Sequence, residues 1–226
     1  IELGADVELN TSDAYLALGG EDTKLIVIDG KKLSTAAATG AASDNYKLTL
    51  ATTYWSRFTT KNPDAKVILR NLTLTSSQTT GTWNSYDLCF ANCNYNFEDV
   101  VFEKAIALEG KAYNLKNVTI KGAALTNGIE TYNCGDATEN VIGSMENVTI
   151  NAVGTGMLIS APCGTATNCS ITGGTNGIEI WIKGNYSASL DLVNSKVEGG
   201  VFAHDEFSSN PSVVNNGTLE LTVDAA

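Results

Sequence analysis

Basic residues, histidine and long hydrophobic runs are all scarce in this sequence. Of its 226 residues, 14 are Lys or Arg against 25 Asp or Glu; one is His, and the net charge is −11. Phosphate binding requires clustered Lys and Arg, so this charge argues against a nucleic-acid partner. No stretch approaches the ~18–20 apolar residues of a membrane span, so we expect no membrane insertion.

The start of the sequence also lacks two common features. It begins at Ile1 without Met, and it shows no charged segment followed by an apolar one, as a signal peptide would. We therefore expect a processed form or a part of a longer protein, with any signal and anchor outside this sequence.

Proline is rare, at 3 residues, whereas glycine contributes 21 and hydrophobic residues 43%. The hydrophobic share is sufficient for a packed core. Frequent Gly, Asn, Thr and Ser are typical of short strands joined by turns. The composition therefore predicts an all-β protein.

A repeated motif sets the architecture, with "LRNLTLTS" at 69–76, "LKNVTIKG" at 115–122 and "MENVTINA" at 145–152. Aligned on its central residue, the motif recurs at intervals of 18 to 30 residues, and such periods are typical of stacked solenoids. The predicted column of corner residues is Asn45, Asn71, Asp99, Asn117, Asn147, Asn168, Asn194 and Asn216.

Apolar residues alternate with period two on each side of this column, but the alternation shifts by one residue across it. Around Asn117, for example, the apolar positions are Leu115 before it and Val118 and Ile120 after it. A phase shift indicates a bend between two strands, and Asn and Asp tolerate the left-handed backbone that a tight bend needs. We expect the Asn side chains of successive corners to hydrogen-bond along the column.

A third strand follows in each repeat. It begins with a glycine and an apolar residue, as in "NGIETY", "TGMLIS", "NGIEIW" and "GGVFAH", which start at residues 127, 155, 176 and 199. The sequence therefore predicts a single-stranded right-handed parallel β-helix with about three strands per turn and about 9–10 turns. We expect one domain over 1–226, with an atypical cap or partial turn at 1–21 and the last strand and exit at 217–226.

The Asn corner followed by Val-Thr-Ile resembles the pectate-lyase-like superfamily of parallel β-helices over roughly residues 20–220. The segment "TWNSYDLCFANCNYNFEDVVFEKAIALEGKAYNLKNVTI" also resembles β-helix domains of bacterial surface or secreted proteins of unassigned activity. The resemblance implies an extracellular or cell-surface location in a bacterium. Two other folds agree less well with the sequence. Leucine-rich repeats need regular L-x-x-L-x-L spacing, which is absent. In an antiparallel sandwich the Asn-Gly pairs would join hairpins, whereas here they follow the repeat period.

In enzymes of this superfamily, substrates lie across one sheet of the β-helix. By resemblance, that sheet corresponds here to the one formed by the glycine-led third strands. Its outward positions would carry Glu130 and Glu179 two strands apart, a separation that an inverting glycosidase could use. These two carboxylates are the catalytic candidates. The candidate ligand-binding residues are Tyr132, Trp181, His204, Asp205, Tyr54, Trp55, Arg57 and Trp83.

Each candidate has a structural explanation beside the functional one. The aromatic ladder could be covered by loops, and the aromatic residues around Arg57 and Trp83 could pack insertions onto the flank. His204 beside Asp205 could be a solvated surface pair, since nothing identifies an activated serine for a triad. A polysaccharide lyase would need clustered carboxylates for Ca²⁺ with a basic residue nearby, and the polygalacturonase motifs are missing.

The five cysteines lack zinc-type spacing, so we expect no metal site and no cofactor; Ca²⁺ is conceivable but unsupported. Cys134 and Cys163 follow aligned glycines on successive repeats and could pair. The sequence favours a non-catalytic structural or adhesive module that contacts a polysaccharide or a cell-surface protein. The alternative is a polysaccharide lyase or glycoside hydrolase.

Overall fold

The computed structural model describes residues 1–11, 15–31, 45–52, 56–77, 88–122, 127–131, 139–182, 188–205 and 219–223. All regular structure in these ranges is β-strand, so the all-β prediction is confirmed for them. No helix in this part of the chain is long and apolar enough to cross a membrane.

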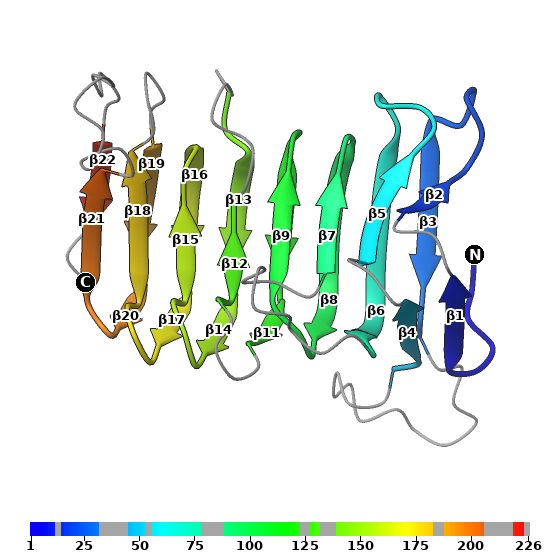
Figure 1. The fold of residues 1–226 in the computed structure, drawn as a ribbon, viewed down its shortest axis with the longest axis horizontal. Coiled ribbons are helices and arrows are strands. Elements are labelled where there is room, and N and C mark those ends of the chain that lie inside the picture. The colour runs from blue at the N-terminus through cyan, green and yellow to red at the C-terminus, as the bar shows by residue number, and fades with distance from the viewer. Residues whose placement is uncertain are drawn as a thin grey trace.

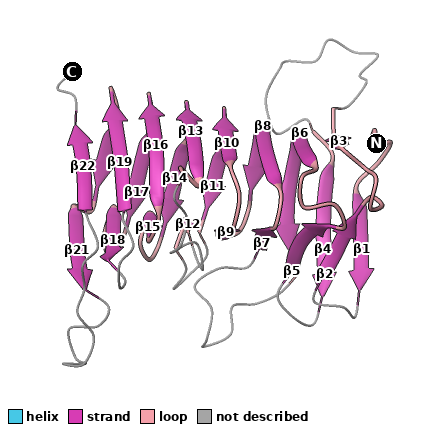
Figure 2. Ribbon diagram, turned by 90° about the horizontal axis from the view of Figure 1, so that it is seen from above, coloured by secondary structure: helices cyan, strands magenta, loops and turns pink. Residues whose placement is uncertain are grey.

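The strands form two curled parallel sheets, seen as two separate layers in Figure 2. Fourteen strands form the first sheet: β1 (Val7–Thr11), β3 (Leu25–Asp29), β4 (Lys47–Thr52), β6 (Lys66–Ser76), β8 (Asn94–Phe102), β10 (Tyr113–Lys116), β11 (Thr119–Lys121), β13 (Ile142–Glu146), β14 (Thr149–Ala152), β16 (Pro162–Thr167), β17 (Ser170–Gly173), β19 (Ala188–Val193), β20 (Lys196–Glu198) and β22 (Leu219–Val223). Eight form the second: β2 (Tyr15–Leu18), β5 (Ser56–Thr60), β7 (Leu88–Ala91), β9 (Ile106–Glu109), β12 (Ile129–Glu130), β15 (Met157–Ile159), β18 (Ile178–Ile182) and β21 (Val201–Asp205).

The chain visits the two sheets in a regular order, so that each repeat pairs in parallel with the next (Figure 1). One repeat runs through β13, β14 and β15, and these strands pair with β16, β17 and β18 of the following repeat. About three strands per turn were predicted. The strands belong to two sheets, because β6 and β8 run through the corner residues Asn71 and Asp99 without interruption.

The corners have the left-handed backbone that the Asn repeat predicts. The φ angle lies between 47° and 56° at Asn71, Asp99, Asn117, Asn147, Asn168 and Asn194. Side chains of neighbouring corners hydrogen-bond along the stack: Asn117 donates to Asp99 over 3.0 Å, and Asn147 donates to Asn117 over 3.1 Å. The column therefore combines a backbone requirement with a ladder of side-chain amides.

An insertion opens one corner near the N-terminal end. The backbone N–H of Tyr46 donates to the carbonyl of Gly30, so the chain resumes the stack at residue 46 after an excursion. Here the amide of Asn71 donates to Asp29, over 3.0 Å, a partner that the sequence analysis did not include. Asn45 begins the described segment after the excursion, and Asn216 lies outside the described residues.

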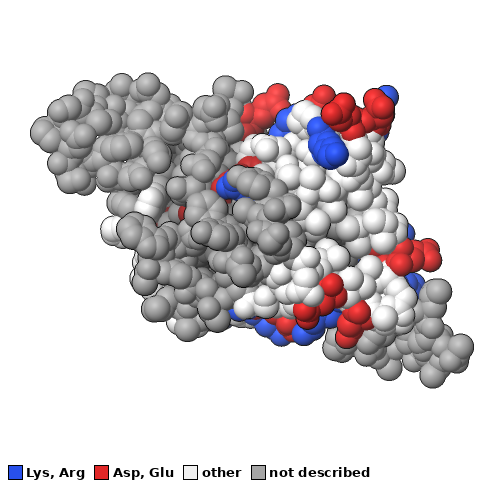
Figure 3. All heavy atoms as spheres, turned by 45° about the vertical axis from the view of Figure 1, so that its right-hand side comes forward, with Lys and Arg blue, Asp and Glu red and all other residues white. Residues whose placement is uncertain are grey.

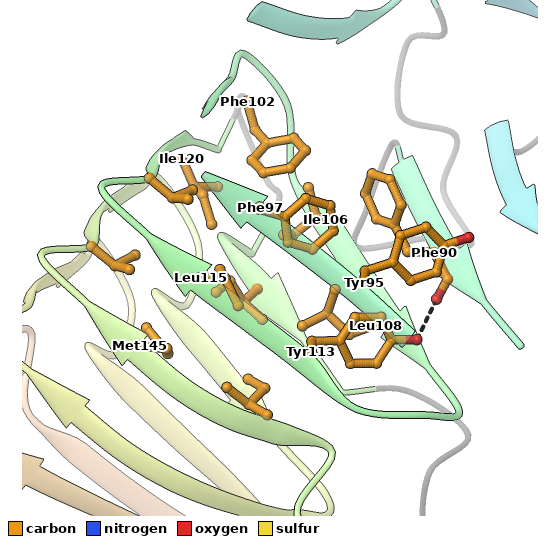
Figure 4. Packing of buried hydrophobic residues seen from close by; sticks show 14 of the residues in the cluster. Phe90, Tyr95, Phe97, Phe102, Ile106, Leu108, Tyr113, Leu115, Ile120 and Met145 are labelled. Carbon is orange, nitrogen blue, oxygen red and sulfur yellow. Dashed lines mark hydrogen bonds between the residues drawn. The ribbon is translucent and has the colours of Figure 1, made fainter. Parts of the chain in front are cut away.

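The core lies between the two sheets and is filled by the inward side chains of every repeat. Its aromatic part comes from successive strands: the rings of Phe58 and Phe90 stack at 5.1 Å between centroids, and those of Tyr95 and Tyr113 at 5.7 Å. The buried Tyr113 hydroxyl donates to the carbonyl oxygen of Phe90 over 2.7 Å (Figure 4). Aromatic stacking and buried hydrogen bonds both stabilise this part of the stack.

Four of the described cysteines are buried and form no disulfide, namely Cys89, Cys93, Cys163 and Cys169. The pairing considered between Cys134 and Cys163 is therefore wrong for Cys163, whose thiol contacts the carbonyl oxygen of Ala161 at 3.6 Å. Cys134 itself lies outside the described residues. Cys169 is 3% exposed and packs as a small apolar residue.

The N-terminal strands complete one level of the stack, since β1 pairs with β4 and β2 pairs with β5. Their inward residues Leu9, Leu16 and Leu18 are half-buried and pack against the core.

In Figure 3, acidic and basic side chains gather along the upper, lower and right-hand borders, and the described surface between them is largely uncharged.

Candidate functional site

The outward face of the second sheet brings the two catalytic candidates into one column. Glu130 pairs in register with Leu158, and Leu158 pairs with Glu179. Two strand spacings put the backbones of Glu130 and Glu179 about 9–10 Å apart. The structure extends the column in both directions: its members are Arg57, Cys89, Ala107, Glu130, Leu158, Glu179 and Phe202.

Accessibility along this column increases toward the C-terminal end. Cys89, Ala107 and Glu130 are 1%, 0% and 5% exposed, whereas Phe202 is 52% exposed. Glu179 and Trp181 are half-buried. A ligand from solution therefore reaches the β18–β21 part of this face most easily.

Trp181 and Phe202 form an aromatic pair on that accessible part. Phe202 is in register with Glu179, and Trp181 is in register with His204, so the two aromatic residues are diagonal neighbours. Strand spacing and residue rise place their Cα atoms about 8 Å apart. Phe202 was not among the candidate site residues, although it belonged to the aligned outward column.

Three described residues donate hydrogen bonds to the carboxylate of Glu179. Trp181 Nε1–H donates to Oε1 over 2.7 Å, and Thr155 Oγ1 donates to Oε2 over 2.8 Å. Asn176 Nδ2 adds a third hydrogen bond to Oε2, at 3.3 Å. These contacts fix the orientation of the indole and occupy both carboxylate oxygens.

Glu130 has a similar partner at the same place in its repeat. Asn127 Nδ2 donates to Glu130 Oε2 over 3.4 Å, and Asn127 Oδ1 accepts the backbone N–H of Thr155 at 3.1 Å. The Asn three residues before each Glu is visible in the sequence as "NGIE", so this network has a signal that the sequence analysis left unused.

Glycines set the path of the chain just before these strands. A Cβ on Gly156 would lie 2.5 Å from the carbonyl oxygen of Gly177 and 2.8 Å from Ile171. A Cβ on Gly128 would likewise lie 2.5 Å from the carbonyl oxygen of Gly156. Only glycine allows successive backbones to approach this closely.

A buried ion pair occupies the N-terminal part of the same face. Arg57 lies on β5, and its Nη2 contacts Glu109 Oε2 at 2.6 Å. Arg57 Nε also donates to Cys89 Sγ over 3.4 Å. Neither Glu109 nor Cys89 was predicted as a site residue, because their proximity to Arg57 depends on the register of β5, β7 and β9.

The environment of this pair keeps the thiol neutral. Burial raises the pKa of Cys89 to about 12; the charge of Glu109 contributes to the rise, and Arg57 offsets part of it. The side-chain oxygen Oε1 of Glu109 is buried and has no hydrogen-bond partner among the described residues. A buried carboxylate oxygen without a hydrogen-bond partner is unusual in folded proteins.

Several predicted ligand contacts cannot be placed. Tyr54, Trp55, Trp83 and Tyr132 lie outside the described residues. His204 and Asp205 belong to β21 by their backbone, and the described part of the structure does not include their side chains.

Metal binding finds no support in the part of the chain that the structure describes. No group of three or more His, Cys, Asp or Glu side chains there could hold a metal ion.

Two surface depressions lie away from this face. One, of about 200 Å³, crosses β8, β10 and β13 and is lined by Asn96, Glu98, Asn114, Lys116, Ser144 and Glu146 among others. Its polar side chains pair with one another: Ser144 donates to Asn114 over 3.0 Å, and Lys116 contacts Glu146 at 3.1 Å. The other, of about 480 Å³, is lined partly by Asp29 and Tyr46.

No family model, curated protein or solved structure matches the chain.

Proposed function

We propose that this chain is a non-catalytic module of a secreted or surface-exposed bacterial protein. In this proposal it is a right-handed parallel β-helix with three strands per turn and a pectate-lyase-like fold. The stacked repeats act as a rigid spacer, and the outward face of the second sheet contacts a glycan. The parallel pairing of every repeat and the sequence resemblance support the fold part of the proposal.

The orientation of Trp181 supports the proposal that this face binds a glycan. Its indole N–H donates to Glu179 over 2.7 Å, so the ring is held in one orientation before any ligand arrives. Phe202, with 52% of its surface exposed, lies diagonally beside it. Rigid aromatic side chains lose little conformational entropy on binding, and they offer apolar area to the C–H face of a sugar ring.

The hydrogen bonds of the carboxylates favour binding over hydrolysis. In an inverting glycosidase one carboxylic acid protonates the glycosidic oxygen, and one carboxylate activates a water on the opposite face of the sugar ring. Glu179 instead accepts hydrogen bonds from Trp181, Thr155 and Asn176. Glu130 is 5% exposed, which makes contact with a polymer in solution difficult.

A polysaccharide-active enzyme is the second candidate, and one observation favours it. Arg57 and Glu109 lie on the same face, and Glu109 Oε1 has no hydrogen-bond partner. An arginine beside a carboxylate could assist proton abstraction in a lyase. Incubation with a polysaccharide panel, followed by assays for reducing ends and unsaturated products, tests this candidate; activity lost in Arg57→Ala would establish it.

A glycan-array screen of the purified chain tests the binding proposal. We expect wild-type binding to at least one glycan and loss of that binding in Trp181→Ala and Phe202→Ala. Leu25→Ala is the matched control, because Leu25 is 57% exposed but belongs to β3 of the first sheet. Binding unchanged in both aromatic variants would contradict the proposed site, and an array without any binding would contradict the proposed function.

A further inference from the structure

We propose that a second copy of this chain docks on the N-terminal end of the stack, so that the two N-terminal ends face each other across a two-fold axis. This inference does not depend on the proposed glycan site. It follows from the incomplete burial of the first layer, from the strand edges at that end and from the path of the chain at the other end.

The N-terminal layer of the stack consists of residues 1–3, β1 and β2. The backbone N–H of Leu3 donates to the carbonyl oxygen of Asp29 over 2.9 Å, so residues 1–3 add to the edge of β3. In the same layer, β1 pairs with β4 and β2 pairs with β5. The three segments therefore end their columns of strands at one level, and this end of the stack has no step.

The inward side chains of this layer are covered on one side only. Leu9 and Leu16 are half-buried, whereas their register partners in the next layer, Leu50 and Phe58, are 1% and 0% exposed. The half-buried inward residues of the layer are Leu3, Val7, Leu9, Leu16 and Leu18. Terminal repeats of a solenoid normally carry a polar outer face that keeps the end soluble. Here the end is apolar instead, and apolar surface of this kind marks an interaction site.

Charged side chains lie at the rim of this end. Figure 3 is turned so that the N-terminal side comes forward, and the described surface between its charged borders is largely uncharged. On β1, the exposed Glu8 alternates with the half-buried Val7 and Leu9, so its carboxylate points outward. A partner on this end therefore covers apolar surface and leaves the charges in water.

The strand edges at this end are suited to pairing. Among the described strands, β1 has β4 as its one neighbour and β2 has β5. Half of the backbone N–H and C=O groups of an edge strand point away from its neighbour and can pair with another chain. Neither strand contains a proline or an inward-pointing charge, the features with which edge strands prevent such pairing.

A second copy of the chain supplies a matching surface. Each layer of the stack already joins the next through such edges and such inward apolar residues, as β1 joins β4. Docking of a second copy continues this type of interface beyond the first layer. Because the same residues lie on both sides, the contact is self-complementary, as in the two-fold dimers that are the commonest homo-oligomers.

The path of the chain at the C-terminal end disfavours head-to-tail stacking. There β22 lies on β19, one layer beyond β20 and β21. Residues 1–3 belong to the same column of strands as β22, since both follow the order that runs from β3 through β6 to β19. If β1 of one copy lay on β20 of another, these two segments would meet at one position. Two N-terminal ends meet without this collision.

The dimer also has a consequence for the proposed function. It doubles the length of the spacer and directs the two C-terminal ends away from each other. Two β18–β21 faces then lie at opposite ends of one assembly, and a polymer that reaches both is bound more tightly than at one face.

Sedimentation equilibrium of the purified chain over a series of concentrations tests the inference. We expect a reversible equilibrium between monomer and dimer without larger species, because a two-fold contact closes the assembly. The dimer should persist at high salt, which weakens charge pairing but not apolar contacts. A monomer at every concentration, or a series of growing oligomers, would overturn the inference.

A charge on the inward side of β1 tests the position of the contact. We expect Leu9→Lys to raise the dissociation constant of the dimer by roughly tenfold or more, because docking would bury an unpaired ammonium group. Val153→Lys is the matched control, since Val153 is 56% exposed and follows β14, away from both ends of the stack. A dimer that is as stable in Leu9→Lys as in Val153→Lys would contradict docking at this end.

Cross-linking keeps the inference testable if circular dichroism shows that Leu9→Lys does not fold. In a Cys134→Ser background, Glu8→Cys puts a thiol on the exposed side of β1, and Lys196→Cys puts one on β20. We expect a bismaleimide to link two Glu8→Cys chains to each other and not to link Glu8→Cys to Lys196→Cys. Links between the two different variants would show head-to-tail stacking and overturn the inference, as would the absence of links between Glu8→Cys chains.

Discussion

Replacement of one corner asparagine tests how the repeat determines the fold. Asn117 has φ 53°, and its side chain both donates to Asp99 and accepts from Asn147. A left-handed backbone costs an ordinary L-residue about 1–2 kcal/mol, and each exposed ladder hydrogen bond contributes about 0.5–1 kcal/mol. We therefore expect Asn117→Ala to lower the free energy of unfolding by about 2–4 kcal/mol.

Glycine at the same position separates the backbone effect from the hydrogen bonds. Asn117→Gly loses the same two hydrogen bonds but adopts the left-handed backbone without a Cβ penalty. We expect it to be more stable than Asn117→Ala by about 0.5–1 kcal/mol, after allowing for the greater entropy of glycine in the unfolded chain.

Asn114, three residues before Asn117, is a matched control. It too donates to one ladder neighbour, Asn96, and accepts from another, Ser144, but it lies inside strand β10. Glycine in a strand is less stable than alanine by about 0.5–1 kcal/mol, so the order of the Gly and Ala variants should invert at this site.

Urea unfolding of the four variants, with the m-value as a check on unchanged compactness, measures these differences. The same Gly and Ala order at Asn117 and Asn114 would refute the argument that the repeated Asn serves a left-handed corner.

Three further predictions concern packing, a buried hydrogen bond and a thiol. Gly156→Ala should strongly lower the midpoint of urea unfolding, because the added Cβ would lie 2.5 Å from the carbonyl oxygen of Gly177. Gly4→Ala is the control and should leave the midpoint unchanged, because no atom lies within 4 Å of its added Cβ. Equal midpoints for the two variants would contradict the close approach of the backbones at Gly156. Tyr113→Phe should lower the free energy of unfolding by about 1–3 kcal/mol, measured by urea unfolding, because it removes a buried hydroxyl whose one proton lies within hydrogen-bond distance of two carbonyl oxygens, those of Phe90 and Glu109. A cost near zero would contradict this contribution. The pKa of Cys89 is raised from 9.0 in an ordinary thiol to about 12 in the folded protein. The thiol should therefore leave the free energy of unfolding unchanged below pH 9 and lower it between pH 9 and 12, because the unfolded state loses this proton first. If the wild type instead gained stability relative to Cys89→Ala as the pH rose from 9 to 12, the pKa shift would have the opposite sign.

The corner geometry was predictable because its signal is local. The shift in the apolar alternation around residues such as Asn117 indicates a bend, and Asn is a residue that accepts a left-handed φ. The structure has φ 53° at that position. The insertion between Gly30 and Tyr46 could not be placed from the sequence, because only the backbone hydrogen bond between them shows where the stack resumes.

The site was predictable only in part, because it depends on register and on side-chain partners. The alignment on glycines placed Glu130 and Glu179 in one column, and the strand pairing has them there. The partners that hold Glu179, including Thr155 from the preceding repeat, require three-dimensional distances. The contact of Arg57 with Glu109 could not be predicted either, because it depends on the register of β5, β7 and β9.

Hydrogen–deuterium exchange with the tightest-binding glycan of the array is the most direct test of the proposed binding face. The account predicts that the glycan slows exchange in peptides covering 176–182 and 201–205, and that Trp181→Ala abolishes this protection. Protection over the first sheet instead, for example around the depression near Asn114, or protection that persists in Trp181→Ala, would contradict the account.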